Sequence, residues 1–223
     1  MLLVGLDRYL VSIISVSLRI SFTALLISGA ISALVASTLS FLRFPGRRYL
    51  QAFVHTGMGV PSVIVGLVTL IALGEQGPFG SLGLLWTPSA MIISQTVLIT
   101  PLITGFMLSS LESVDDTLYL TAVTLGATRW QRILTIFYEA RHGFLTALLA
   151  GFGRAISEVG SVILVGGNIV WSNDISYTRT MTTAIVVETR KGNFETALAL
   201  GLVLVFIVLL VNMLANRLKG SEI

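Results

Sequence analysis

The feature that most constrains this chain is the recurrence of long apolar stretches along its length. A helix needs about 20 predominantly apolar residues to cross the hydrocarbon core of a bilayer. Five stretches are long enough, and they run approximately from Ile20 to Leu42, Leu50 to Leu73, Ser89 to Leu111, Phe144 to Val165 and Ala197 to Leu214. We therefore expect an all-α polytopic membrane protein with about five transmembrane helices, in which residues 1–223 form a single transmembrane domain.

The composition agrees with lipid as the main solvent. Hydrophobic residues make up 54% of the chain and charged residues only 11%, too few to cover the surface of a soluble domain. The formal charge of +3 is therefore no sign of nucleic-acid binding, and we expect a lipid bilayer around the chain. Because the chain has no cysteine, thiolate zinc sites and iron–sulfur clusters are excluded. We expect no metal and no cofactor.

One further apolar segment, from Met181 to Val187, is too short to cross the bilayer. It is followed directly by the charged residues Glu188, Arg190 and Lys191. We therefore expect a helix that lies in the interface between lipid and water.

Basic residues outside the spans predict the orientation of the chain. An odd number of spans puts the termini on opposite sides, and short cytoplasmic loops are enriched in arginine and lysine. If the amino terminus is outside, the outer segments hold only Arg8, Arg179, Arg190 and Lys191. The cytoplasmic segments then hold Arg43, Arg47, Arg48, Arg129, Arg132, Arg141, Arg217 and Lys219. We therefore expect the amino terminus outside and the carboxyl terminus in the cytoplasm.

The long loop between the third and fourth spans carries explicit helix signals. Ser113 and Asp116 have the spacing of a capping box, and apolar residues then repeat at helical spacing until Gly126 supplies a stop. Thr128 and Gln131 form a second box, followed by another apolar face. We expect two short helices with a glycine break between them at the inner membrane surface. A connector lying on the lipid headgroups is the simpler alternative.

Residues 120–133 of this loop resemble the coupling segment of ABC importer permeases. They read Leu-Thr-Ala-Val-Thr-Leu-Gly-Ala-Thr-Arg-Trp-Gln-Arg-Ile. The family pattern is Glu-Ala-Ala-x-x-x-Gly-Ala followed by an aromatic and a basic position, and Ala122, Gly126 and Ala127 match it. The departures are Leu120 in place of the glutamate, Thr121 in place of the first alanine and Glu139 in place of a later proline.

Other segments extend the resemblance over most of the chain, in the same order as in the family. These segments are similar to molybdate-type and tungstate-type permeases, and the residues of the fourth span and of Thr178 to Leu200 are closest to those of tungstate permeases. They are Val-Pro-Ser-Val-Ile-Val-Gly at 60–66, Ser-Gln-Thr-Val-Leu-Ile-Thr-Pro at 94–101, Gly-Arg-Ala-Ile-Ser-Glu-Val-Gly-Ser at 153–161, Gly-Gly-Asn at 166–168 and Gly-Asn-Phe-Glu-Thr-Ala-Leu-Ala at 192–199.

The resemblance implies a transport subunit of a prokaryotic cell membrane (inner or plasma membrane) rather than an enzyme. The chain has no Gly-x-x-x-x-Gly-Lys-Ser/Thr phosphate loop, so ATP hydrolysis is expected on a separate ATP-binding cassette subunit. An extracytoplasmic substrate-binding protein is the second implied partner. Five spans enclose too small a bundle for a full transporter, and the resemblance implies two permease chains around a shared pathway, so we also expect a homodimer. Within the coupling loop, 113–141, the residues expected to contact the ATPase are Thr121, Ala122, Gly126, Ala127, Arg129 and Arg132.

Prolines and hydroxyl groups mark a candidate translocation path. Pro61 and Pro101 lie inside apolar spans, where each removes a helical hydrogen bond, and such breaks often line a pathway. The alternative is a kink needed only for packing. Ser62, Thr96 and Thr100 lie close to these prolines and could donate hydrogen bonds to a desolvated anion. The same hydroxyl groups could simply join helices together.

Two charged residues in the fourth span complete the candidate path. Arg154 and Glu158 are four residues apart, which places them on one face of a continuous helix. Because an unpaired charge in a span costs at least about 2.5 kcal/mol, we expect the two to pair. The pair could brace two spans or form a gate, and binding of substrate by Arg154 ranks third.

We therefore expect the permease subunit of an importer for a tetrahedral oxyanion. The resemblance favours tungstate, then molybdate, with sulfate or phosphate behind. A membrane scaffold or sensor that transports nothing is one alternative. A secondary transporter is another, although that class usually has repeated halves and more intramembrane carboxylates than the single Glu158.

Overall fold

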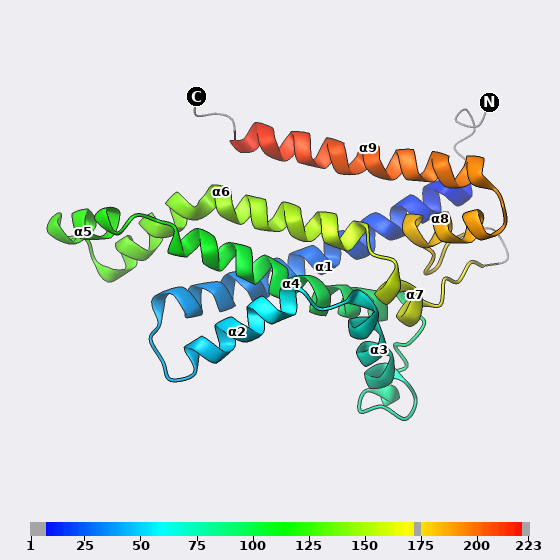
Figure 1. Ribbon diagram of the computed structural model, residues 1–223, viewed down its shortest axis with the longest axis horizontal. Helices are drawn as coiled ribbons and strands as arrows, with labels where there is room; N and C mark the ends of the chain where they lie inside the picture. Colours follow the sequence, from blue (N-terminus) through cyan, green and yellow to red (C-terminus); the bar gives the residue numbers. More distant parts are fainter. Residues whose placement is uncertain (1–7, 172–174, 220–223) are drawn as a thin grey trace.

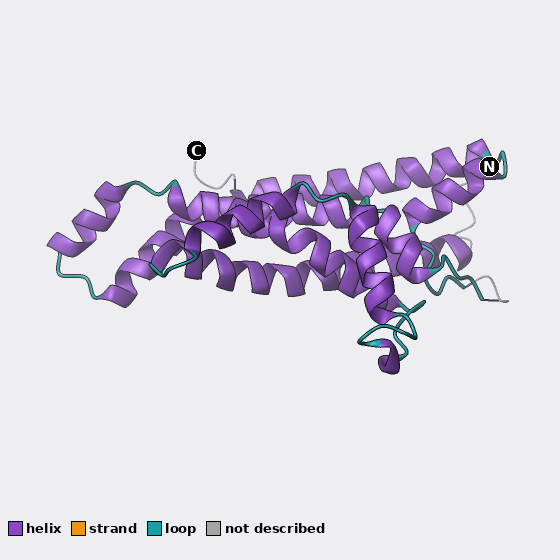
Figure 2. Ribbon diagram, turned by 60° about the horizontal axis from the view of Figure 1, so that its bottom comes forward, coloured by secondary structure: helices purple, strands orange, loops and turns teal. Residues whose placement is uncertain are grey.

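The computed structural model describes residues 8–171 and 175–219, and this part of the chain is almost entirely helical (Figures 1 and 2). Within it, the only extended pairing is a bridge between Val170 and Ser176. The expected all-α fold is confirmed. The helices are α1 (Arg8–Phe41), α2 (Arg47–Met58), α3 (Ser62–Leu73), the 3-10 turn η1 (Gly80–Leu82), α4 (Pro88–Glu112), α5 (Asp116–Thr124), α6 (Arg129–Ile156), α7 (Gly160–Gly166), α8 (Met181–Arg190) and α9 (Phe194–Lys219).

In the described part of the chain, three helices are long and apolar enough to cross a membrane alone. They are α1, α4 and the Phe194–Ala215 part of α9. Two helix pairs meet the same criterion only together: α2 with α3, bent by 106°, and α6 with α7, bent by 57°. If each bent pair is one span, the count is five, which agrees with the five apolar stretches of the sequence.

The second and fourth spans are both interrupted, the second at Pro61, where the sequence predicts a break, and the fourth at a place where it predicts none. The second ends at Met58 and resumes at Ser62, because Pro61 has no N–H to donate and is extended (φ −60°, ψ 132°). The fourth ends at Ile156 and resumes at Gly160. Each of these spans therefore consists of two half-helices that point in different directions, and α3 projects away from the long axis of the bundle (Figures 1 and 2).

Two helices are longer than predicted. α1 begins at Arg8 rather than near Ile20, so its 34 residues extend about 50 Å, well beyond the thickness of the hydrocarbon core. α6 begins inside the coupling loop and continues to Ile156 without interruption. The second helix of the loop and the first part of the fourth span are therefore one helix, not two.

α4 is the central helix of the bundle and contacts α1, α2, α3, α6 and α7. Glycines on its neighbours let the backbones approach closely. A Cβ on Gly151 of α6 would lie 2.5 Å from Ile103 Cδ1, and a Cβ on Gly57 of α2 would lie 2.7 Å from Pro101 Cβ. Small residues of this kind allow the close helix packing that is typical of membrane proteins.

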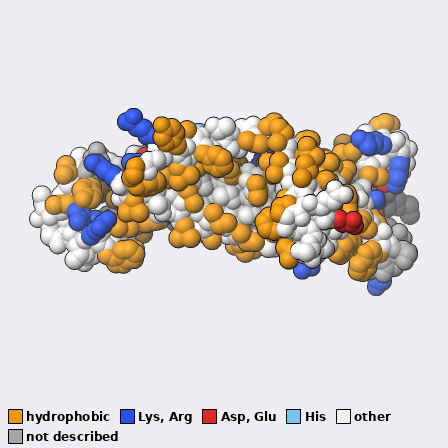
Figure 3. Space-filling view, turned by 90° about the horizontal axis from the view of Figure 1, so that it is seen from below, with side chains coloured by type: hydrophobic (Ala, Val, Ile, Leu, Met, Phe, Trp, Pro, Cys, Tyr) orange, Lys and Arg blue, Asp and Glu red, His pale blue; other side chains and the backbone are white. Residues whose placement is uncertain are grey.

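The outer surface of the bundle is apolar along its middle and charged toward its ends. Figure 3 shows hydrophobic side chains over the centre of the visible face and lysine and arginine near both ends. Of the three single-helix spans α9 is the most exposed, with only 11% of its most apolar window buried. In a membrane protein such a surface faces lipid or another chain.

The short helix predicted at Met181 to Val187 is present as α8 and extends to Arg190. One face of it packs against α1 and α9. Met181 is fully buried, and its N–H donates to Ser17 Oγ of α1 (2.8 Å). α8 is therefore a packed part of the bundle and does not rest on lipid headgroups alone.

Candidate functional site

The bends of the second and fourth spans lie against each other. A Cβ on Gly66 of α3 would lie 2.6 Å from Ser161 Cα of α7, so the two half-helices touch backbone to backbone. A Cβ on Gly160 would lie 3.3 Å from Ser62 Oγ and 3.5 Å from Glu158 Oε1. The structure thus brings Ser62 and Glu158, two predicted path residues, to one junction between the first turns of α3 and α7.

Glu158 is buried at this junction, with 5% of its surface exposed. Its Oε1 accepts the N–H of Ser161 (3.1 Å), and its carbonyl oxygen accepts the hydroxyl of Thr182 in α8 (2.8 Å). The carboxylate therefore caps the start of α7, where no side chain at the N-cap position Val159 does so.

The expected pair of Arg154 and Glu158 is not formed. Arg154 is exposed on the last turn of α6, and its guanidinium makes no ion pair with Glu158. The reason is that α6 ends at Ile156, so residue 158 no longer follows the helical path. Positions i and i+4 share a face only while the helix continues.

The two prolines of the candidate path behave differently. Pro61 occupies the N-cap position of α3, at the 106° bend. Pro101 lies inside α4, which continues past it to Glu112, so the predicted break is absent there. The Pro101 ring packs against Gly57 of α2.

Thr96 and Thr100 lie on the side of α4 that faces α1. Ser28 Oγ and Ser32 Oγ of α1 donate to the carbonyl oxygens of Thr96 (3.3 Å) and Thr100 (3.1 Å). The Thr100 hydroxyl donates to the Thr96 carbonyl (2.6 Å). The contacts to α1 therefore use main-chain carbonyl groups. Neither threonine hydroxyl bonds to another helix, and Thr96 Oγ1 has no hydrogen-bond partner in the described structure.

Buried polar groups near the amino-terminal half of α4 were not predicted from the sequence. Gln95 is 2% exposed, and its Nε2 donates to the carbonyl oxygen of Ala155 at the end of α6 (3.0 Å). Its Oε1, together with the hydroxyls of Ser94 and Ser161, has no hydrogen-bond partner in the described structure. Such groups are costly in a membrane interior. The signal in the sequence was Gln95, an amide side chain inside the apolar stretch from Ser89 to Leu111, which indicates a buried polar contact.

The coupling loop forms the end of the molecule opposite to α8 (Figure 1). The expected box of Ser113 and Asp116 is wrong, since Asp115 is the N-cap of α5 and accepts the N–H of Thr117 (2.8 Å). This hydrogen bond lowers the pKa of Asp115. Ser113 instead ends α4, where its hydroxyl donates to the carbonyl oxygen of Ser110 (3.0 Å).

The break between α5 and α6 has the predicted chemistry. Gly126 has a φ of +77°, a left-handed conformation that favours glycine. The capping box of Thr128 and Gln131 is complete and begins α6. Thr121 and Arg129 are exposed, and Ala122 and Ala127 are half-buried.

One predicted ATPase contact, Arg132, is engaged within the loop. Its Nη1 donates to Tyr119 Oη (2.8 Å), and its guanidinium lies over the Tyr119 ring, 5.1 Å from the centroid. Arg132 therefore joins α5 to α6. Large apolar side chains in the same loop are exposed, including Leu125 at 81% and Trp130 at 68%. Exposed apolar groups at a polar end indicate a surface for another protein.

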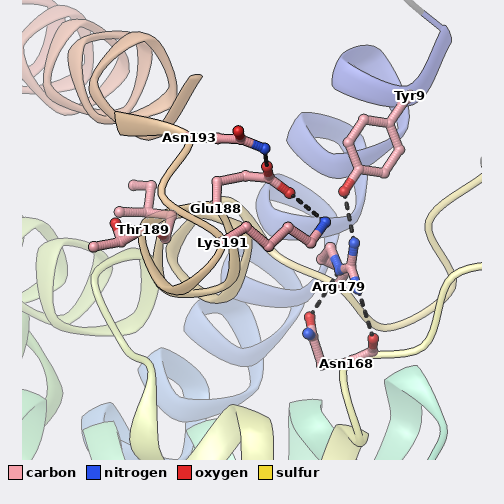
Figure 4. Close-up of polar contacts among 8 residues, drawn as sticks. Tyr9, Asn168, Arg179, Glu188, Thr189, Lys191 and Asn193 are labelled. Carbon is pink, nitrogen blue, oxygen red and sulfur yellow. Dashed lines mark hydrogen bonds and ion pairs between the residues drawn. The ribbon is translucent and has the colours of Figure 1, made fainter. Parts of the chain in front are cut away.

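A polar cluster closes the opposite end of the molecule (Figure 4). Arg179 donates from Nη1 to Tyr9 Oη (2.7 Å) and from Nε to Asn168 Oδ1 (3.1 Å), tying the start of α1 to the segment after α7. The Glu188 carboxylate accepts Asn193 Nδ2 and Lys191 Nζ, both at 2.9 Å, at the turn between α8 and α9. These two hydrogen bonds lower the pKa of Glu188.

Comparison with known proteins identifies the kind of bundle this is. A family model described as "Binding-protein-dependent transport system inner membrane component" matches residues 26–220. The chain belongs to this family. It is therefore a multi-pass transport subunit of the cell membrane and not an enzyme, and its resemblance to ABC importer permeases is confirmed.

Individual relatives cover nearly the whole chain. A "Probable anion ABC transporter permease protein" of Haloferax volcanii is 49% identical over 211 residues, 95% of this chain and 91% of the relative. The "Tungstate uptake system permease protein TupB" of Peptoclostridium acidaminophilum is 38% identical over 218 residues, 98% of this chain and 93% of the relative. A crystal structure of a bacterial alginate ABC transporter with its periplasmic protein has a TM-score of 0.74 at 20% identity, over 97% of this chain and 83% of its own. The similarity to this solved structure concerns the fold alone.

Proposed function

We propose that this chain is the membrane permease subunit of an ABC importer for a tetrahedral oxyanion, with tungstate as the favoured substrate. The observation that carries the proposal is the near full-length similarity to a tungstate permease at 38% identity, alongside an anion permease at 49%. Molybdate is the second candidate, because it has the same tetrahedral geometry and charge.

In this proposal the coupling loop contacts an ATP-binding cassette subunit on the cytoplasmic side. The exposed face of α5 and the turn at Gly126 form the contact, and Arg129 is free to pair with acidic groups of the partner. Arg132 has a supporting role, since its contact with Tyr119 holds α5 against α6. The carboxyl terminus is cytoplasmic, and the cluster around Arg179 lies outside, where a substrate-binding protein would dock.

The translocation path is proposed to follow the two adjoining bends, between two copies of the chain. Ser62 offers a hydroxyl at the bend of the second span, and Arg154 offers a solvent-accessible cation beside the bend of the fourth. Glu158 supports the bend beside Arg154 by capping α7. Thr96, Thr100 and Pro101 support the path from the packed side of α4.

Uptake in cells that lack this chain tests the proposal. Restoring the chain should restore accumulation of tungstate, and to a lesser degree of molybdate, measured by elemental analysis of washed cells. Unchanged accumulation of both anions would remove the substrate assignment. Stable assembly with an ATPase but no uptake of any oxyanion would favour a membrane scaffold.

Gly126→Arg tests the coupling loop separately. No atom lies within 4 Å of a Cβ at Gly126, so the change adds a bulky cation to an open surface and strains the left-handed φ by about 1–2 kcal/mol. We expect normal membrane insertion and at least tenfold slower uptake. Gly126→Asn is the matched control, because asparagine tolerates this conformation and should retain most of the uptake. Normal ATP-dependent uptake by the arginine variant would contradict the contact.

A further inference from the structure

A basic depression lies at the end of the molecule that carries α5, where the turn between α1 and α2 meets the end of α4. Its volume is about 640 Å³. Three arginines, Arg43, Arg47 and Arg48, line it together with Gln51 and Glu112. The site therefore has three guanidinium groups against one carboxylate.

Most of the hydrogen-bond donors in this depression are unused. Glu112 Oε1 accepts from Arg47 Nη2 (3.1 Å) and Gln51 Nε2 (3.2 Å). Arg47 Nε is buried without a partner, and the exposed guanidinium groups of Arg43 and Arg48 have none among the described residues. An unmatched set of guanidinium donors is suited to the planar, bidentate recognition of phosphate oxygens.

The backbone adds to the attraction for an anion. Gly46, at the N-cap of α2, has a φ of +95° and provides no side-chain cap, and the first turn of α2 contains no acidic residue. Among the residues that line the depression, only Glu112 offers a negative charge to the positive end of the helix dipole.

Exposed apolar side chains continue along the chain from the depression. Tyr49, which lines it, is 83% exposed, and Phe53, one helical turn further along α2, is 71% exposed. Leu42 and Leu50, which adjoin Arg43 and Tyr49 in the sequence, are also exposed. A free anion would make no favourable contact with these apolar side chains. A phospholipid would, because it supplies acyl chains as well as a phosphate. The arginines directly follow the apolar part of α1, at the depth of the headgroups.

We propose that Arg43, Arg47 and Arg48 bind the phosphate group of an anionic phospholipid at the membrane face that carries α5. The lipid phosphate competes with Glu112 for Arg47. Because Glu112 is the last residue of α4 and lies three positions before the N-cap of α5, an occupied site loosens the link between α2 and the base of the coupling loop. This proposal does not depend on which anion is transported.

Native mass spectrometry of the purified full-length assembly in mild detergent tests the proposal. Phosphatidylglycerol, phosphatidylcholine with the same acyl chains, and inorganic phosphate are titrated separately. We expect phosphatidylglycerol to bind at least tenfold more tightly than phosphatidylcholine. Arg43→Gln with Arg48→Gln should weaken this binding about 25-fold, at about fivefold for each arginine, and leaves the pair of Arg47 and Glu112 in place. Arg217→Gln, which removes an exposed arginine of α9 outside the depression, should leave the binding unchanged.

A change in the opposite direction separates binding from misfolding. Glu112→Gln removes the competing carboxylate and should strengthen phosphatidylglycerol binding severalfold, a result that a damaged fold would not produce. Equal binding of the two lipids, or unchanged binding in the double arginine variant, would overturn the proposal. So would displacement of phosphatidylglycerol by millimolar inorganic phosphate through the same arginines, since the ligand would then be a free anion.

Discussion

Glu158 illustrates how a charged side chain is accommodated inside this bundle without a cation partner. It lies two residues past the end of α6, where the backbone N–H groups that begin α7 need an acceptor. The carboxylate supplies it through Ser161. The fourth span is therefore bent at a point where the chain carries its own capping group.

Glu158→Leu should lower the stability of the purified protein by about 1 kcal/mol, the usual cost of losing an N-cap. Glu158→Gln keeps an oxygen acceptor and should lose less than half of that. Thermal unfolding in detergent measures the difference, with Glu195→Gln, in the exposed first turn of α9, as the control. Equal losses in the two Glu158 variants would contradict the capping role.

Glu188 should make the turn between α8 and α9 sensitive to acid. Its pKa is lowered by hydrogen bonds from Asn193 and Lys191, so the folded state binds a proton less readily than the unfolded state. Its contribution to stability is therefore complete above the ordinary pKa of 4.5 and is lost as the pH falls through the lower, folded value. The unfolding temperature of Glu188→Gln should lie below that of the natural protein at neutral pH, and the two should converge as the pH falls below 4.5 and through the folded pKa. Parallel curves over this range would argue against the contact.

At the scale of elements, the sequence predicted where apolar helices occur but not how two of them are interrupted. The apolar run around Pro61 and the run around Pro101 look alike, yet only the first is broken. The difference depends on tertiary contacts, because Gly57 lets α2 pack directly on the Pro101 ring. The cap of α5 was missed for a related reason. Several cap-forming residues follow one another, and the choice of Asp115 depends on α4 continuing to Glu112.

The contact between the half-helices α3 and α7 requires glycine at position 66. Gly66→Val would place its Cβ 2.6 Å from Ser161 Cα, so the helices would have to separate. We expect a loss of about 1–3 kcal/mol, the typical cost of overpacking, seen as a lower unfolding temperature and reduced uptake. Gly201→Val in α9 is the control, because nothing lies within 4 Å of its Cβ. A Gly66 variant as stable as this control would show that α3 and α7 do not pack as described.

At the scale of the whole molecule, orientation can be tested because the chain contains no cysteine. Arg190→Cys and Arg217→Cys place single thiols at exposed positions on either side of α9. Arg190 is the last residue of α8, just before α9 begins, and Arg217 lies near the carboxyl end of α9. A membrane-impermeant maleimide should label the Arg190 variant in intact cells and the Arg217 variant only after permeabilisation. The reverse pattern would invert the proposed topology, and labelling of both in intact cells would show that α9 does not cross the membrane.

The length of α6 has a mechanical consequence. It runs without interruption from Arg129, beside the proposed ATPase contact, to Ile156, beside the bend. At 1.5 Å per residue this is a stiff rod of about 42 Å, so a tilt of about 5° at one end moves the other by about 4 Å. That displacement equals the separation of two side chains in contact. A small rotation at the loop is thus geometrically sufficient to exchange one packing neighbour for the next at Arg154.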